Sequence, residues 1–159
     1  MKGVVIINAE TEEHINAVRD LFSEYVKSVG FGRYFSGFSK ELKELPGKYS
    51  PPRGRLYLAK HGILYVACAG LSETEDGIAE IQGLYVKPEY RKQGIGKTLA
   101  ELVVNDARAM GYPLIRLEVI RDKMSQAINI FSEMGFYDIT EYYPNPVEGH
   151  VYMEMELNL

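Results

Sequence analysis

The chain has 159 residues, of which 46% are hydrophobic and 25% are charged, and its formal net charge is -4. This composition is that of an ordinary globular protein, and the mild acidity excludes a general basic surface for nucleic acid. The single Cys68 excludes an internal disulfide, and the longest apolar run, residues 63–71, is much shorter than the roughly 20 residues that span a bilayer. We therefore expect one cytoplasmic domain over residues 1–159, with neither nucleic acid nor a membrane as a partner.

The first part of the chain predicts a strand followed by two helices. Residues 4–7 form a short apolar strand, and Thr11 is a suitable N-cap because its hydroxyl can accept a hydrogen bond from the first helical turn. Apolar side chains then recur at helical spacing, at Ile15, Val18, Leu21, Phe22 and Tyr25. The glycine-rich residues 30–37 interrupt this pattern, and a weaker helix covers about residues 39–45.

Three strands are predicted between residues 55 and 86. The first two surround His61 and Gly62, which indicates a hairpin. The third, residues 77–86, contains Gly83, and a glycine inside a strand often marks a bulge. Consecutive strands of this kind favour an antiparallel meander.

The second half of the chain alternates helices with strands. Apolar residues between Ile95 and Met110 form one helical stripe, and residues 113–120 are a β-branched, alternating strand. A second helical face ends at Gly135 and consists of Ala127, Ile128, Phe131 and Met134. Two strands follow, at residues 136–140 and 150–159. Because β-α-β units favour parallel pairing, the fold class is mixed α/β, with one central, largely antiparallel sheet flanked by helices.

The stretch PEYRKQGIGKTLAELV, residues 88–103, joins a strand to a helix and suits an anion. The first N–H groups of a helix have no internal partner and lie at the positive end of its dipole, so a phosphate binds there readily. Gly94 and Gly96 lack a Cβ, which lets ligand oxygens approach the main chain. Positive charge comes from Lys87, Arg91, Lys92 and Lys97, offset only by Glu89. The loop therefore suits a phosphate or pyrophosphate.

Three phosphate-binding patterns compete for this loop. A P-loop needs a glycine where the chain has Arg91, and the dinucleotide fingerprint needs one where it has Leu99, so both fail. The pattern [QR]-x-x-G-x-[GA] is matched by RKQGIG, residues 91–96. A tight strand-to-helix turn with solvated basic side chains is the alternative to a ligand site.

With a strand before it, an amphipathic helix after it and FSEMGF one β-α unit later, this motif resembles the GNAT superfamily of acyl-CoA-dependent N-acyltransferases. The resemblance covers residues 78–157 by motif and the N-terminal half by element order. It implies that acetyl-CoA is the co-substrate, with its pyrophosphate on the loop and its pantetheine arm along the preceding strand. The implied acetyl-CoA residues are Leu84, Tyr85, Val86, Arg91, Lys92, Gln93, Gly94, Ile95, Gly96, Lys97 and Thr98.

The resemblance also implies two parallel strands in the middle of the sheet that splay apart at a bulge, where Gly83 lies, and leave a cleft for the thioester. The tail segment EYYPNP, residues 141–146, looks like a GNAT subgroup with a Tyr-Tyr-x-Asn-Pro segment near the acceptor side of the cleft. We expect residues 142–147 and 30–37 to form walls of the acceptor pocket. A loop with aromatic packing is the alternative.

Transfer to an amine needs a base for the ammonium proton, an N–H donor for the carbonyl oxygen and a proton for the leaving thiolate. Glu80 and Glu118, on neighbouring strands, are the candidate catalytic bases, since burial raises a carboxyl pKa. The alternatives are an exposed strand-end charge for Glu80 and an ion pair with Arg116 or Arg121 for Glu118. The three histidines do not cluster, and no metal site is expected.

The segment IFSEMGF departs from the resemblance at one position. Many GNAT enzymes have a Tyr there that protonates the departing CoA thiolate, and this chain has Phe131. An Asn that many members have seven residues earlier falls near Met124. We expect Phe131 in the apolar core and a proton from solvent or from a tail phenol, with Tyr142 and Tyr143 as catalytic candidates ahead of Tyr137.

The reaction implied is direct transfer of an acetyl group from acetyl-CoA to a primary amine. The acceptor stays open between a small molecule, an amino acid and a protein N-terminus or lysine. An acyl-CoA-binding sensor or structural module without transferase activity is the alternative, and a nucleotide-binding regulatory domain is a third option. The alternating last strand is a candidate edge strand for contact in a homodimer, and a strand that faces the core is the simpler alternative.

Overall fold

The central sheet has seven strands in the order β1-β2-β3-β4-β5-β7-β6. The computed structural model describes residues 2–30 and 38–158, so residues 31–37 of the expected acceptor-pocket wall lie outside the described residues. The strands are β1 Val4–Asn8, β2 Arg55–His61, β3 Leu64–Glu73, β4 Ala79–Val86, β5 Leu114–Ile120, β6 Tyr137–Asp138 and β7 His150–Glu156. The helices are α1 Glu12–Val29, α2 Phe38–Glu44, α3 Ile95–Ala109 and α4 Ser125–Met134, with short 3-10 turns η2 Gly47–Tyr49, η3 Pro88–Tyr90 and η4 Thr140–Tyr142.

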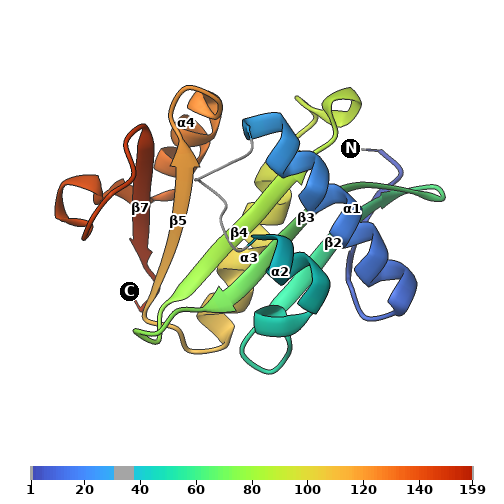
Figure 1. Cartoon of the computed structure of the whole chain (residues 1–159), viewed down its shortest axis with the longest axis horizontal. Coiled ribbons are helices and arrows are strands. Elements are labelled where there is room, and N and C mark those ends of the chain that lie inside the picture. The colour runs from blue at the N-terminus through green and yellow to red at the C-terminus, as the bar shows by residue number, and fades with distance from the viewer. Residues whose placement is uncertain (1, 31–37, 159) are drawn as a thin grey trace.

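The order of these elements agrees with the predicted order. All neighbouring strands are antiparallel except β4 and β5, which are parallel in the middle of the sheet (Figure 1). The prediction of a mixed, largely antiparallel sheet flanked by helices is therefore confirmed. The helix cap predicted at Thr11 is also present, because its Oγ1 accepts a hydrogen bond of 3.1 Å from the His14 N–H.

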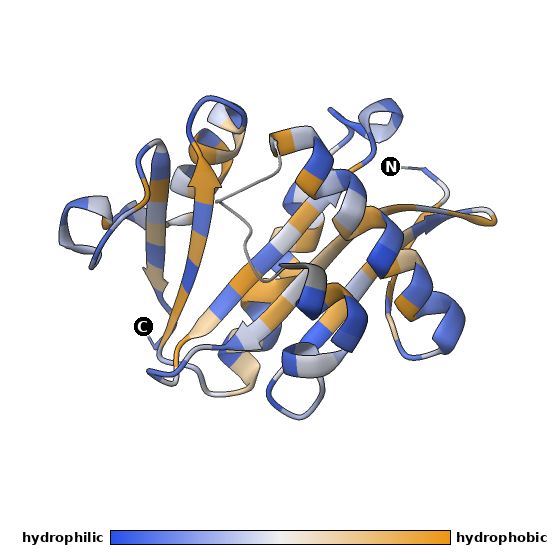
Figure 2. Ribbon diagram, viewed as in Figure 1, coloured by the Kyte–Doolittle hydropathy of each residue, from blue (hydrophilic) through white to orange (hydrophobic). Residues whose placement is uncertain are grey.

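Alternation along the strands gives the sheet two apolar faces (Figure 2). In β2, Leu58 packs with α1 residues such as Val18 on one face, whereas Ala59 belongs to the core that α3 and α4 cover on the other face. The buried side of α3 includes Leu99 and Val103, neither of which is exposed. Each helical stripe found in the sequence therefore faces the sheet.

The parallel pair of strands separates soon after it begins. β4 and β5 share only two residue pairs, Ala79 with Ile115 and Glu80 with Arg116. On its other side, β4 has a bulge against β3: Gly70 faces Gln82 and Cys68 faces Tyr85, so two residues of β4 lie opposite one of β3. Gly83 is in this bulge with a φ of 65°. The predicted bulge and the predicted splay are both present.

Of the two alternatives for the last strand, the structure shows the core-facing strand, because β7 is buried over six of its seven residues. β7 pairs with β5 along its whole length, and the two-residue β6 covers its other side at Met153 and Glu154. Glu154 is also fixed by a 2.6 Å hydrogen bond from Arg116 Nε, so its carboxylate is not an open edge charge. Within residues 2–30 and 38–158, no helix combines the length and the apolar character needed to cross a membrane.

We predict that Gly83→Ala destabilises the protein by roughly 2–4 kcal/mol, because it combines a left-handed backbone with overpacking of a core. A Cβ at Gly83 would lie 2.4 Å from Cε1 of Phe22, whose ring is 1% exposed and has no room to move. Gly77→Ala is the matched control, since Gly77 has a φ of 74° and no atom within 4 Å of a Cβ. Urea denaturation measures both variants. Equal losses of stability would show that the contact with Phe22 does not constrain the bulge.

Candidate active site

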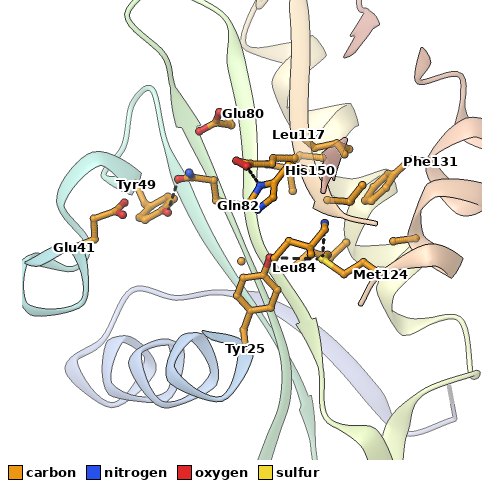
Figure 3. Close-up of a pocket in the computed structure, with 16 residues that line it drawn as sticks. Tyr25, Glu41, Tyr49, Glu80, Gln82, Leu84, Leu117, Met124, Phe131 and His150 are labelled. Carbon is orange, nitrogen blue, oxygen red and sulfur yellow. Dashed lines mark hydrogen bonds and ion pairs between the residues drawn. The ribbon is translucent and has the colours of Figure 1, made fainter. Parts of the chain in front are cut away.

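Two neighbouring cavities lie where β4 and β5 separate. The inter-strand cavity, of about 210 Å³, is lined by residues 80–84 of β4 and 117–120 of β5, with Tyr25 and His150 among the side chains around it (Figure 3). The loop cavity, of about 530 Å³, lies at the start of α3 and is lined by residues 84–86 and by most of residues 90–97. The two cavities share part of their walls, so they lie side by side along β4, and we call the two together the groove.

The loop cavity brings together most of the residues implied for acetyl-CoA. The predicted residues that line it are Leu84, Tyr85, Val86, Arg91, Lys92, Gly94, Ile95, Gly96 and Lys97. Lys123 and Gln126, which the sequence did not single out, line it as well. Gln93 is not among its lining residues, and the Thr98 hydroxyl bonds back to the Gly94 carbonyl at 2.9 Å.

The two glycines of the loop leave the start of α3 open. Gly94 is the N-cap residue of α3, with a left-handed φ of 83°, and its φ explains why glycine suits that position. Gly96 is helical, and a Cβ there would meet only Val86 Cγ2 at an ordinary 3.5 Å. Neither packing nor backbone conformation requires glycine at position 96, so its missing side chain leaves space for a ligand.

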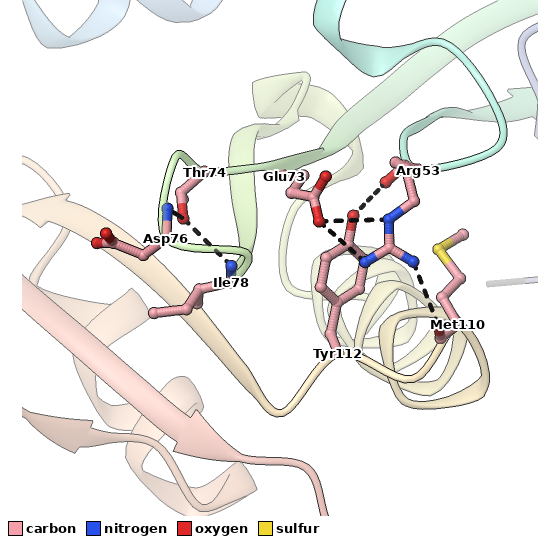
Figure 4. A network of polar contacts seen from close by, with 7 residues as sticks. All are labelled: Arg53, Glu73, Thr74, Asp76, Ile78, Met110 and Tyr112. Atoms are coloured by element: carbon pink, nitrogen blue, oxygen red, sulfur yellow. Dashed lines mark hydrogen bonds and ion pairs between the residues drawn. The ribbon is translucent and has the colours of Figure 1, made fainter.

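The opposite end of the sheet is closed by polar contacts (Figure 4). The guanidinium of Arg53 lies 4.0 Å from the ring centre of Tyr112 and 3.0 Å from a Glu73 carboxylate oxygen, while the Tyr112 hydroxyl donates a 2.6 Å hydrogen bond to the Arg53 carbonyl. The turn between β3 and β4 is held by Thr74, whose Oγ1 accepts hydrogen bonds from the N–H groups of Asp76 and Ile78. These contacts hold the start of β4, at the end of the strand away from the loop cavity.

Glu80 lines the inter-strand cavity at the last residue pair of β4 and β5. Burial is the main cause that raises the pKa of its carboxyl, and the nearby Glu118 and Glu41 raise it further. Lys48 and Arg116 act in the opposite direction. A carboxyl whose pKa is raised in a cavity is suited to take a proton from an ammonium group.

Glu118 is paired differently from what the sequence suggested. Its carboxylate contacts Nδ1 of His150, a side chain that is 3% exposed, and not Arg116 or Arg121. Arg116 instead binds Glu154. The sequence therefore did not identify His150 as the partner of Glu118. This pair depends on the register of β5 against β7, in which Ile120 faces His150. No sequence pattern predicts that register.

Phe131 is a core residue, as predicted. Its side chain is 4% exposed, and its ring packs edge-on against Phe136 with ring centres 5.4 Å apart. Phe131 also lines both cavities, so it occupies the wall of the groove where the resemblance implies a tyrosine.

The tail tyrosines differ in position. Tyr142 is 80% exposed and lines neither cavity, which does not favour it as a proton donor. Tyr143 stacks on Tyr152 with ring centres 3.8 Å apart. Burial raises the pKa of the Tyr143 phenol, and the charges of Glu80 and Glu118 raise it further. Only the second of the two tyrosines therefore faces the carboxylates.

Two tyrosines of the inter-strand cavity were missed in the sequence. Tyr25 belongs to the apolar stripe of α1, and Tyr49 ends a turn-rich loop, so neither stood out as polar. The Tyr49 hydroxyl donates a 2.8 Å hydrogen bond to Oε1 of Gln82. The Tyr25 hydroxyl lies 3.9 Å from Sδ of Met124. No cluster of three or more His, Cys, Asp or Glu suited to a metal ion occurs within residues 2–30 and 38–158.

Comparison with known proteins places the chain in a family. The sequence profile of the Acetyltransferase (GNAT) family matches residues 15–136. A Schizosaccharomyces pombe protein named an uncharacterized N-acetyltransferase is 29% identical over 158 residues, covering 98% of this chain and 96% of that protein. The Bos taurus thialysine N-epsilon-acetyltransferase is 29% identical over 135 residues, covering 84% of this chain and 74% of that protein.

The fold is also similar to that of solved acetyltransferase structures. The PaiA N-acetyltransferase of Thermoplasma acidophilum, crystallised with coenzyme A, superposes with a TM-score of 0.71 at 20% identity, covering 96% of this chain and 98% of that one. The splayed strands, the open start of α3 and the family match all agree with an acetyltransferase fold. The chain therefore belongs to the GNAT family of acetyltransferases, enzymes that transfer an acetyl group from acetyl-CoA to an amine.

Proposed function

We propose that acetyl-CoA lies along β4, with its pyrophosphate in the loop cavity and its thioester where the two cavities meet, and that the acceptor amine enters through the inter-strand cavity. The observation that carries this proposal is the parting of β4 and β5 after two residue pairs. Beyond Glu80, β4 has no ladder partner in β5, so an extended pantetheine arm has room to lie beside it. Ligands of open α/β sheets commonly bind at the carboxyl ends of such strands.

The charges of the loop cavity suit a pyrophosphate. Arg91, Lys92, Lys97 and Lys123 all line it. The first N–H groups of α3 add the positive end of a helix dipole, with no side chain at Gly96 to cover them. Phosphate groups therefore meet both fixed dipoles and mobile cations at this place.

The carboxylates of the inter-strand cavity serve as the base in this proposal. Glu80 is the first choice, because its burial raises its pKa toward the range in which a carboxylate can accept an ammonium proton. Glu118 is the second, with His150 holding its carboxylate. The neutral amine nitrogen then attacks the thioester carbonyl carbon, the N–C bond forms, and the C–S bond breaks with its electron pair left on sulfur.

The acceptor that fits best is an ammonium group on a slender chain. The inter-strand cavity, at about 210 Å³, is smaller than the roughly 300–1,000 Å³ of common small-molecule sites. Its carboxylates favour a cation. The bovine relative is named for an N-epsilon amine, which is such a group. A free alkylamine and a lysine side chain both satisfy these conditions, and a protein N-terminus is the alternative.

A binding module without transferase activity is the second candidate function. It is less favoured, because such a module needs no carboxylate with a raised pKa beside the groove, and Glu80 is one. A single catalytic domain over residues 1–159, a homodimer and a cytoplasmic location belong to the same proposal. Light scattering over a range of concentrations tests the dimer.

We predict that mixing the protein with acetyl-CoA and a terminal diamine such as 1,5-diaminopentane releases free CoA, detected with a thiol reagent. The matched control is 1,5-pentanediol, which has the same chain and no amine. Release of CoA with the diamine but not with the diol supports acetyl transfer to nitrogen. Tight binding of acetyl-CoA without thiol release from any amine in a panel would favour the binding module.

We predict that Gly96→Asp weakens acetyl-CoA binding by more than tenfold, a loss of about 1.4 kcal/mol or more, because it places a negative charge beside the pyrophosphate. Gly96→Asn is the matched control, since its side chain has nearly the same volume and no charge. Isothermal titration calorimetry compares the two. Wild-type affinity in both variants would remove the pyrophosphate from this loop.

We predict that kcat/KM of the wild type rises with pH as the Glu80 carboxyl loses its proton. Since burial raises its pKa, this limb lies above the value of about 4.3 that is usual for Glu. Glu80→Gln should abolish the limb and lower kcat/KM by about 10²–10⁴-fold. Glu41→Gln, which changes the same charge at a residue already 2.6 Å from Lys48, is the control and should cost less than tenfold. A large loss in Glu118→Gln alone would assign the base to Glu118.

A further inference from the structure

We propose that Tyr25 donates a hydrogen bond to the departing CoA sulfur, from the wall of the groove that faces Phe131. This inference rests on the proposed position of acetyl-CoA. The residues that line both cavities mark the place where the thioester meets the acceptor. Those residues are Tyr25, Leu84, Met124, Ala127 and Phe131. Among these described residues, Tyr25 is the only one whose side chain carries an O–H or N–H group.

The position of the Tyr25 hydroxyl is set by packing. Its ring is edge-on to that of Tyr85 on β4, with ring centres 6.2 Å apart. Its hydroxyl lies 3.9 Å from Sδ of Met124, at the start of α4. Figure 3 shows the ring rising from α1 into the cavity while Phe131 enters it from α4. The hydroxyl is therefore directed at the junction between the two cavities.

The protonation state of Tyr25 suits a donor. Burial, followed by the charges of Glu118 on β5 and Cys68 on β3, raises the pKa of Tyr25 to about 12. The phenol is therefore neutral throughout the working range of pH. An alkyl thiol is a stronger acid than a phenol whose pKa is about 12, so complete transfer of the phenol proton to a thiolate is unfavourable. The role that fits is hydrogen-bond donation while the C–S bond breaks.

The proton balance of the reaction is complete without an added reactant. An ammonium acceptor loses one proton to the carboxylate base before attack. The nitrogen loses a second proton when the amide forms, and this proton reaches the sulfur or the solvent. Tyr25 stabilises the negative charge on sulfur during this interval and keeps its own proton. No other group has to be oxidised or reduced.

The tail tyrosines are weaker candidates for the same role. Tyr142 is 80% exposed, and Tyr143 is stacked on Tyr152. Neither lines the junction. Tyr65→Phe is the matched control for Tyr25→Phe, because it removes one phenol hydroxyl that contacts Glu13 and lines neither cavity.

The first experiment compares the affinities of CoA and desulfo-CoA by calorimetry at pH 9.5, where a substantial fraction of the CoA thiol is ionised. We expect the wild type to bind CoA at least fivefold more tightly than desulfo-CoA, and Tyr25→Phe to bind both about equally. Unchanged affinity for desulfo-CoA shows that the variant is folded. A variant that keeps the wild-type preference, or that loses both ligands equally, overturns the proposal.

The second experiment measures turnover with an active amine. We expect Tyr25→Phe to lower kcat by at least thirtyfold with little change in the acetyl-CoA Kd, and the control Tyr65→Phe to lower it less than threefold. Phe131→Tyr should change kcat of the wild type by less than tenfold but should recover at least part of the loss in the Tyr25→Phe background. A kcat of Tyr25→Phe within threefold of the wild type overturns the proposal.

The two experiments separate this inference from the proposed function. A wild type that releases no CoA with any amine, yet loses its preference for CoA over desulfo-CoA in Tyr25→Phe, would reject the transferase and support the contact between Tyr25 and sulfur. An active wild type with an unaffected Tyr25→Phe variant would do the reverse.

Discussion

The contact between the Phe22 ring and the backbone at Gly83 is the constraint on which the groove depends. Because the ring lies 2.4 Å from where a Cβ would be, β4 can bulge here only with glycine. The bulge turns β4 away from β5 after two residue pairs, and the space between them becomes the inter-strand cavity. An unbroken parallel pair would close this space with backbone hydrogen bonds. The packing of one aromatic ring on α1 thus accompanies the opening of the sheet at the proposed site of acetyl transfer.

Positive and negative side chains lie in different parts of the groove. Cations lie at the start of α3, whereas the carboxylates of Glu80 and Glu118 line the inter-strand cavity, Glu80 in its buried part and Glu118 with a side chain that is 43% exposed. An acidic chain can therefore hold a polyanionic co-substrate at one end of the groove and attract a cation to the other. The low dielectric of the buried end strengthens both the repulsion between carboxylates and their attraction for an ammonium group.

The sequence predicted features that depend on local patterns. Hydrophobic periodicity located the helices and strands, a six-residue motif located the loop at Gly94 and Gly96, and one glycine located the bulge. Features that depend on the register between distant strands could not be predicted. The His150–Glu118 pair requires β5 and β7 to align in one register. The sequence did not indicate a functional role for Tyr25, because its position in the apolar stripe of α1 is typical of a core residue.

Phe22 and Tyr25 lie three residues apart on α1, so they point from neighbouring turns of the same face. The contact that opens the groove therefore also fixes where the Tyr25 hydroxyl enters it. On the opposite wall, a hydroxyl at position 131 would need a polar partner inside an aromatic cluster, where Phe131 now packs against Phe136. The departing sulfur requires only a donor within hydrogen-bond distance, and either wall of a narrow groove can supply it. A phenylalanine on α4 is thus compatible with catalysis when α1 carries the phenol, because the helix that opens the groove also positions the donor.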